Sequence, residues 1–181
     1  MTPAVRLATP SDLPTVCEII NHYIATTTFN FRTDPQSPDE WLADWRQYHE
    51  HYPWLVATID GALVGVAYAT PWKTRAAYDW SVEVTVYVAH GCTRRGIGRA
   101  LYQRLLSLLD AQGYRTQIAV IALPNDPSIA VHEAFGFRPA GMLRDVGFKH
   151  GSWRDVGFWQ RRTGSFDEAG VPIRPVPDGG A

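Results

Sequence analysis

Hydrophobic patterning along the chain predicts an α+β fold whose central sheet is mixed, mostly antiparallel and of about seven strands, flanked by about four helices. Short β-type runs and amphipathic segments follow one another in the order β-α-α-β-β-β-α-β-α-β-β. Residues 81–88 read SVEVTVYV and alternate with the period of a half-buried strand. The run IAVIAL at residues 118–123 is continuously apolar, which is typical of a central strand covered on both faces.

The first part of the chain contains one predicted strand and two predicted helices. Residues 5–8 form the short strand. A helix follows over residues 9–24, because the segment TPSD supplies a cap, a first-turn proline and an acidic third position. A second helix at residues 37–48 begins with the capping box SPDE. The stretch between the helices, residues 26–36, is expected to run as an extended loop over the domain.

Residues 54–69 read as two strands joined by an Asp-Gly dipeptide, which is a strong hairpin signal. A loop at residues 70–79 leads into the strand at 81–88. The valines of that strand face one way, and the opposite face carries Glu83, Thr85 and Tyr87.

A helix is expected after residue 96, because leucines recur along one face as far as Gly113, which ends it. An Asp-Pro pair begins another helix at residue 126, and two β runs near residues 137–143 and 153–160 complete the body. We therefore predict one domain at residues 1–162. The Pro/Gly-rich tail at residues 163–181 has little to bury and is expected to be irregular or disordered.

Composition narrows the class of function. The formal net charge of −1 gives no overall field that attracts nucleic acid or anionic lipid. No run approaches the roughly 20 apolar residues of a membrane span, and the N-terminus lacks the apolar core of a signal peptide. The two cysteines form neither a zinc spacing nor a disulfide framework, and the triplet HEH at residues 49–51 presents side chains that point apart. We expect a cytoplasmic protein without a metal.

The stretch TRRGIGRALYQRLL at residues 93–106 runs from a basic glycine loop into a helix. Backbone N–H groups at a helix N-terminus bind phosphate, and glycines let the backbone approach the oxygens closely. The lysine and Ser/Thr of a P-loop are missing, and Leu101 replaces the third glycine of a dinucleotide-binding motif. By itself the loop is weak evidence, because an ordinary strand–helix turn has the same pattern.

Together with its neighbours, the loop resembles the acetyl-CoA motif of GNAT acetyltransferases, R/Q-x-x-G-x-G/A after a strand. Two further family elements follow in order, an asparagine after the apolar strand and the segment VHEAFGFRPAG. The resemblance covers residues 5–162 and implies acetyl-CoA as co-substrate. The cofactor-binding residues that it implies are Val86, Tyr87 and Val88 for the pantetheine arm, Arg94, Arg95, Gly96, Ile97, Gly98 and Arg99 for the pyrophosphate, and Asn125 for coenzyme A.

Longer strings resemble one branch of that family, the phosphinothricin N-acetyltransferases: NHYIATTTFNFRTDPQ, YPWLVA, PWKTRAAYDW, LPNDPS and KHGSWRDVGFWQ. His132 also matches this branch, where many other GNAT enzymes carry a tyrosine acid. The resemblance implies a homodimer that acetylates the α-amine of phosphinothricin, and of the related methionine sulfoximine, and so confers resistance. Two alternatives stay open: an N-acetyltransferase for another amino acid such as methionine sulfone, and a non-catalytic acyl-CoA-binding sensor.

Acetyl transfer to an amine requires a base, and Glu83 is the candidate, although a solvent-facing strand glutamate is the plainer interpretation. The position of His132 suggests a second base or a proton donor, while Tyr102 or Tyr87 is an alternative donor to the thiolate. Phosphinothricin carries a carboxylate and a phosphinate, so its site needs cations. By resemblance, the acceptor site is lined by Phe31, Lys73, Arg75 and Tyr78.

Overall fold

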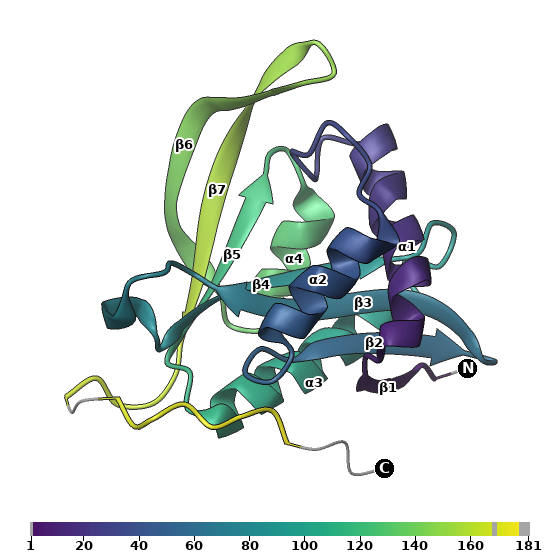
Figure 1. Ribbon diagram of the computed structural model, residues 1–181. Coiled ribbons are helices and arrows are strands. Elements are labelled where there is room, and N and C mark those ends of the chain that lie inside the picture. Colours follow the sequence, from purple (N-terminus) through teal and green to yellow (C-terminus); the bar gives the residue numbers. More distant parts are fainter. Residues whose placement is uncertain (1, 168–169, 178–181) are drawn as a thin grey trace.

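The structure is a computed structural model that describes residues 2–167 and 170–177. Within these residues one seven-stranded sheet has the order β1-β2-β3-β4-β5-β7-β6, and only the β4–β5 pair is parallel (Figure 1). The predicted α+β class is therefore confirmed. In chain order the elements are β1 (Ala4–Leu7), the 3-10 turn η1 (Pro10–Asp12), α1 (Leu13–Thr26), α2 (Pro38–Tyr48), β2 (Trp54–Ile59), β3 (Ala62–Pro71), η2 (Ala76–Tyr78), β4 (Ser81–Val88), α3 (Ile97–Gln112), β5 (Thr116–Ala122), α4 (Asp126–Ala134), β6 (Arg138–Lys149) and β7 (Ser152–Arg162).

Local sequence signals explain several element boundaries. The Ser37 backbone N–H donates to the Glu40 carboxylate at 2.7 Å, and the Glu40 N–H donates to Ser37 Oγ at 3.3 Å, which is the predicted capping box of α2. Asp60 and Gly61 both adopt positive φ, 51° and 81°, as a tight hairpin turn between β2 and β3 requires. α3 ends at Gly113 with a φ of 104°.

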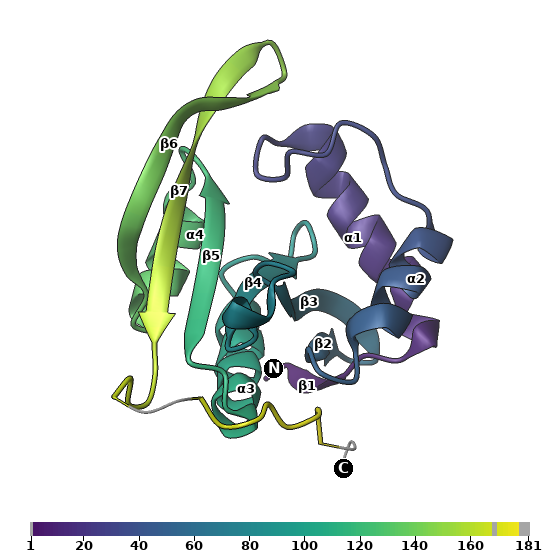
Figure 2. The same cartoon turned by 60° about the vertical axis from the view of Figure 1, so that its left-hand side comes forward.

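Helices cover the two faces of the sheet at different places (Figure 2). α1 and α2 pack on one face of β2 and β3, in a cluster that includes Trp41. α3 packs on the other face, where Leu101 is fully buried. Val82 and Val84 of β4 belong to the α3 cluster. Because side chains alternate along a strand, Glu83 faces the α1–α2 side, as the pattern predicted.

β4 and β5 separate partway along their length. Their ladder runs only from Ser81–Thr116 to Glu83–Ile118, whereas β3 stays paired with β4 as far as Val88. Beyond Glu83, no strand among residues 2–167 and 170–177 pairs with the edge of β4 that faces away from β3. Such an edge can accept an extended ligand by backbone hydrogen bonds.

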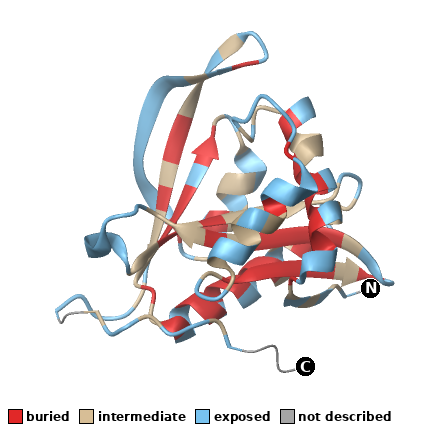
Figure 3. Cartoon of the chain, in the orientation of Figure 1, coloured by how far each residue is buried: buried red, intermediate tan, exposed pale blue. Residues whose placement is uncertain are grey.

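The prediction that β5 is covered on both faces is wrong at one position. Val120 is 38% exposed, because α1 and α2 pack over β2 and β3 and leave this face of β5 open (Figure 3). β6 and β7 form a hairpin longer than the two predicted runs, and it rises above the rest of the sheet (Figure 1). None of the helices in the described ranges is long and apolar enough to cross a membrane.

The C-terminal tail has no helix or strand over residues 163–167 and 170–177, as predicted, but it is attached to the body. The Arg174 N–H donates to the carbonyl of Gln112 at 3.0 Å, and the Gln112 side chain donates to the Arg174 carbonyl at 2.8 Å. Ile173 packs against the α3 cluster. None of the described tail residues is buried, so the segment has little to bury, as expected, and it is these few contacts that attach it to the body.

Candidate active site

Glu83 lies on β4 at the last paired position before β4 and β5 separate. Its side chain lines a pocket of about 170 Å³ between the sheet, α2 and the loop that follows α1. Burial raises the pKa of the Glu83 carboxyl, and the positive charge of Lys73 acts against that rise. A carboxylate that binds a proton more tightly than free glutamate is suited to accept one from an amine.

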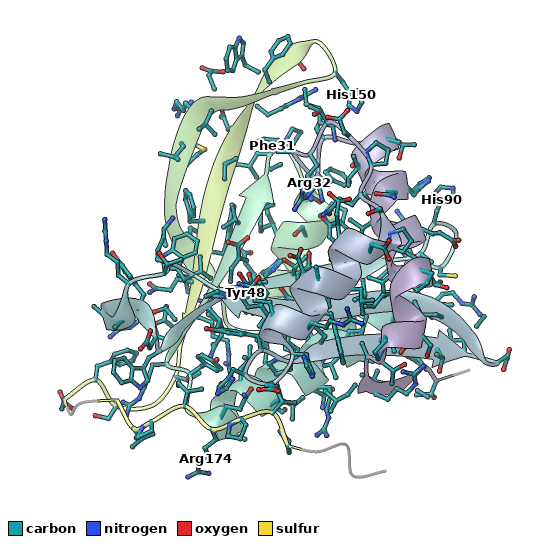
Figure 4. The ribbon with its side chains drawn as sticks, in the orientation of Figure 1. Phe31, Arg32, Tyr48, His90, His150 and Arg174 are labelled. Atoms are coloured by element: carbon teal, nitrogen blue, oxygen red, sulfur yellow. The ribbon has the colours of Figure 1, made fainter. Side chains whose placement is uncertain are left out.

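Most residues around Glu83 in this pocket escaped the sequence prediction. They are Asn30, Arg32 and Gln36 from the loop, Trp41, Asp44 and Tyr48 from α2, and Trp54, Tyr68, Thr70 and Thr85 from β2, β3 and β4. Thr85 shares a face with Glu83, so the period-two pattern contains that signal. Arg32, which Figure 4 labels near Phe31, brings a positive charge to the pocket rim. Because Arg32 lies in a loop, no sequence periodicity predicts that it reaches the pocket beside β4.

Tyr102 of α3 and His132 of α4 form a buried hydrogen-bonded pair. The Tyr102 hydroxyl lies 2.6 Å from His132 Nε2, and His132 Nδ1 lies 2.7 Å from the Ser128 carbonyl. Because a carbonyl only accepts, Nδ1 carries the hydrogen and Nε2 accepts from the tyrosine.

Burial also shifts both pKa values of this pair. It lowers the pKa of His132, against the effect of the Ser128 hydrogen bond. Burial and the charge of Glu83 raise the pKa of Tyr102 well above its usual value. Both side chains are therefore neutral near pH 7, and they are aligned to pass a proton between them.

The loop after β4 has the geometry of an anion site. Gly96 stands at the N-cap of α3 with a φ of 76°, and no side chain caps this helix. Ile97 is buried in the core, whereas Arg94, Arg95 and Arg99 are exposed. The first N–H groups of α3 are thus accompanied by three guanidinium groups, which is a suitable environment for a phosphate.

Gly98 leaves open space at the start of α3. It has no positive φ, and a Cβ placed there would meet only Val88 Cγ2, at 3.7 Å. Nothing in the fold itself therefore requires glycine at this position. Gly65 is different, because its Cβ would lie 3.0 Å from side-chain atoms of Ile97 and Leu101. The missing side chain at residue 98 leaves room for a ligand to approach the backbone closely.

The other predicted cofactor positions lie beside the gap between β4 and β5. Residues 86–88 belong to the part of β4 without a β5 partner. The Val88 carbonyl accepts a hydrogen bond from the Tyr23 hydroxyl at 2.7 Å. Asn125 is the N-cap of α4, and its side-chain oxygen accepts from the Ser128 N–H at 3.3 Å.

The predicted acceptor residues lie outside the pocket that Glu83 lines. Lys73, Arg75 and Tyr78 are exposed on the segment between β3 and β4, where the Tyr78 N–H donates to the Arg75 carbonyl at 2.9 Å. Only Lys73 acts on Glu83 through its charge. Phe31 packs against Gly147 of the β6–β7 hairpin and is 36% exposed (Figure 4).

A separated strand pair beside a basic helix N-terminus, with a carboxylate where the strands part, is an arrangement suited to acyl transfer from a coenzyme A thioester. The chain matches the family model described as acetyltransferase (GNAT) domain over residues 5–157, and it belongs to that family. It is an N-acetyltransferase that uses acetyl-CoA.

Similarity to individual proteins is high over nearly the whole chain. The chain is 54% identical over 172 residues to the phosphinothricin N-acetyltransferase of Streptomyces viridochromogenes, covering 95% of this chain and 92% of that one. It is 30% identical over 170 residues to the L-methionine sulfoximine/L-methionine sulfone acetyltransferase of Salmonella typhimurium, covering 93% and 97%. The crystal structure of a phosphinothricin acetyltransferase from Sinorhizobium meliloti in complex with AcCoA matches with a TM-score of 0.90 at 34% identity, covering 94% of each chain.

Proposed function

We propose that this chain transfers the acetyl group of acetyl-CoA to the α-amine of phosphinothricin, and to that of methionine sulfoximine, and thereby confers resistance. The observation that carries the proposal is Glu83 at the point where β4 and β5 part, facing a pocket between the sheet, α2 and the loop after α1. The 54% identity with a phosphinothricin N-acetyltransferase supports the choice of acceptor.

The chain's own groups hold the co-substrate along β4 and the start of α3. The N–H groups of residues 96–98, with Arg94, Arg95 and Arg99, bind the pyrophosphate, and Asn125 contacts coenzyme A. Residues 86–88 bind the pantetheine arm along the strand edge that β5 leaves free. When bound, acetyl-CoA supplies an acetyl group activated as a thioester. A backbone N–H of β4 stabilises the negative charge that develops on its carbonyl oxygen.

Glu83 removes the first proton from the acceptor. At neutral pH an α-amino group is largely protonated and unable to attack. The carboxylate of Glu83, with its raised pKa, takes this proton directly or through water in the pocket.

The Tyr102–His132 pair handles the second proton, which the amine loses when the amide bond forms. His132 Nε2 receives it through the Tyr102 hydroxyl, and the resulting imidazolium returns a proton by the same route to the departing sulfur. The nitrogen thus loses one proton and the sulfur gains one. This gives His132 the roles of base and donor in turn, with Tyr102 as the intermediate.

The two anionic groups of phosphinothricin require two cationic contacts. Lys73 and Arg75 provide them, Tyr78 adds a hydroxyl, and Phe31 forms an apolar wall. Arg32, which lines the Glu83 pocket, is a third cation available to the acceptor.

We infer a homodimer from the apolar surface of the β6–β7 hairpin. This surface consists of Met142, Leu143, Val146, Phe148 and Trp153, each between 45% and 59% exposed. Large exposed apolar residues gathered on one hairpin favour a protein–protein interface. A cytoplasmic location agrees with two cysteines that are free thiols.

The second candidate acceptor is methionine sulfone, because the Salmonella typhimurium relative is named for that activity. A panel of L-phosphinothricin, methionine sulfoximine, methionine sulfone and glutamate, each with acetyl-CoA and a thiol-release assay, separates the candidates. The proposal requires the highest kcat/KM for phosphinothricin. Higher kcat/KM for methionine sulfone establishes the second candidate, and no thiol release with any of the four contradicts both.

A further inference from the structure

Lys149, at the end of β6, is a buried lysine that the proposed reaction does not use. Its side chain is 5% exposed, and burial lowers its pKa. Lys149 Nζ donates to the carbonyls of Ile24 and Asn30, both at 2.6 Å. No carboxylate forms an ion pair with it among the residues that the structure describes. A desolvated ammonium with only carbonyl partners is costly, so its position calls for an explanation.

The β6–β7 hairpin is bent so that its end reaches the loop after α1. Leu143 pairs with Val156 and Gly147 with Arg154, so residues 144–146 of β6 face a single residue of β7. Such a bulge redirects a strand. Beyond it, a Cβ on Gly147 would overlap the ring of Phe31, which shows how closely the hairpin and the loop approach (Figure 4).

Lys149 joins the end of α1 to the start of this loop. Ile24 lies in the last turn of α1, where carbonyls lack a partner within the helix and the helix dipole favours a cation. Asn30 lies six residues further along the chain. One ammonium group therefore satisfies a helix end and fixes the loop residue that follows it.

Asn30 connects the residues held by Lys149 to the Glu83 pocket. Its side-chain nitrogen donates to the Tyr87 hydroxyl of β4 at 3.1 Å, and its side-chain oxygen accepts the Arg32 N–H at 2.8 Å. Asn30 and Arg32 both line the pocket that contains Glu83. The backbone of Asn30 is held by Lys149 and its side chain by β4, so the two contacts together determine where Arg32 lies.

We propose that Lys149 is a positioning residue that fixes residues 27–32 against β4 and so determines the affinity for the amino-acid acceptor, without touching it. This inference rests on the proposed function, because the acceptor is taken to bind beside Phe31 and Arg32. The far end of the same loop has a separate attachment: Asn21 donates to the Gln36 carbonyl at 2.8 Å and accepts the Gln36 N–H at 2.9 Å. That attachment provides an internal reference.

Amide hydrogen exchange of the enzyme without substrates tests the attachment directly. In Lys149→Met, we expect the Arg32 amide to exchange at least about tenfold faster, while the Gln36 amide changes by less than about twofold. Arg104→Met, which removes an exposed cation from α3, is the matched control and should leave both amides unchanged. Unchanged exchange at Arg32, or equal acceleration at Arg32 and Gln36, overturns the proposal.

Kinetics then separate positioning from a loss of stability. We expect Lys149→Met to raise KM for the acceptor about tenfold, with KM for acetyl-CoA within about twofold of the parent value, and Lys149→Arg to restore part of the loss. Gly147→Ala, which displaces Phe31 from the other side, should raise the same KM. Equal increases in both KM values contradict the proposal. If the parent enzyme fails to acetylate any acceptor, the proposed function fails, whereas the exchange result still decides the attachment.

Discussion

The Glu83 carboxylate is half-buried beside its pocket, and no cation lies within ion-pair distance of it in the described residues. The ionised carboxylate loses hydration because it is partly buried, and the positive charge of Lys73 compensates for that loss only in part. A glutamine of the same shape would avoid that cost. Retaining an acid here fits a residue selected for proton transfer, since groups with a raised pKa and access to a pocket are typical of catalytic sites.

Replacing Glu83 with glutamine should therefore separate activity from binding. We expect Glu83→Gln to lower kcat by about 100-fold or more, as the loss of a general base does. The affinity for acetyl-CoA should stay close to that of the parent enzyme, because the residues that we propose to bind the cofactor lie on the glycine loop and at positions 86–88. Steady-state kinetics and calorimetric titration measure the two effects. Unchanged turnover would remove Glu83 from the role of base.

We also predict how the melting temperature of Glu83→Gln depends on pH. Folding raises the pKa of the Glu83 carboxyl, so between its unfolded and folded pKa values the folded state binds more protons. The contribution of this residue to stability is thus greatest below the unfolded pKa and declines as the pH rises through the folded pKa. Glu83→Gln should melt at or above the temperature of the parent enzyme at pH 8, and the difference should shrink at pH 4. A lower melting temperature at pH 8 would contradict this account.

Sequence patterns predict residues whose role follows from local periodicity, and they miss contacts that depend on folding. The face of β4 that carries Glu83 follows from the alternation in SVEVTVYV. The pairing of Tyr102 with His132 joins two helices 30 positions apart and has no local signal. Lys149 illustrates the same limit, because a lysine near a turn is usually solvated, whereas this one is buried and donates to carbonyls of Ile24 and Asn30, more than 100 positions away.

Among the elements, the start of α3 combines two glycines with different constraints. Gly96 adopts a φ of 76°, which the fold requires irrespective of any ligand. Gly98 has no positive φ, and a Cβ there would have open space around it. We therefore expect a bound ligand, and not the fold, to require glycine at this position. Gly65 of β3, beneath the same helix, is required by packing, because Ile97 and Leu101 approach it closely.

Alanine substitutions distinguish these constraints. Gly98→Ala should raise KM for acetyl-CoA about tenfold by crowding the pyrophosphate, whereas thermal stability should hold or improve because alanine is the better helix former by about 1 kcal/mol. Gly65→Ala, the matched control, should lower the melting temperature, since α3 must shift to admit the methyl group. Kinetics and differential scanning calorimetry check both variants. A normal KM in Gly98→Ala would mean that the pyrophosphate lies elsewhere.

Element order was predictable throughout, because capping, glycine stops and periodicity are local properties. What the sequence did not reveal is the extent of the elements where tertiary contacts decide them. β6 continues to Lys149 because β7 pairs with it beyond the bulge. The tail lies on the body because Gln112, at the end of α3, has a side chain that reaches the backbone of Arg174. Composition alone favours disorder for such a segment.

The apolar residues of the domain divide into a buried group and an exposed group. The two helix-covered clusters are buried, and α1, α2 and α3 account for them. The β6–β7 hairpin instead exposes large apolar side chains on a segment that none of the helices in the described part of the chain covers (Figure 3). Its tip is fixed to the loop after α1 through Lys149, so this surface is presented in a defined orientation. A rigid apolar surface of this kind favours association with a second copy.

An acidic side chain on this surface should therefore dissociate the proposed homodimer into single chains. In size-exclusion chromatography with light scattering, we expect the parent enzyme to have twice the mass of one chain. Leu143→Asp should have the mass of one chain, because a carboxylate that is buried in an interface without a partner opposes association. Val171→Asp, at an equally exposed apolar residue of the tail, is the matched control and should remain dimeric. A single-chain mass for the parent enzyme, or a dimeric Leu143→Asp with unchanged dissociation on dilution, would contradict an interface on the hairpin. Circular dichroism of Leu143→Asp should match that of the parent, because Leu143 lies outside both buried clusters.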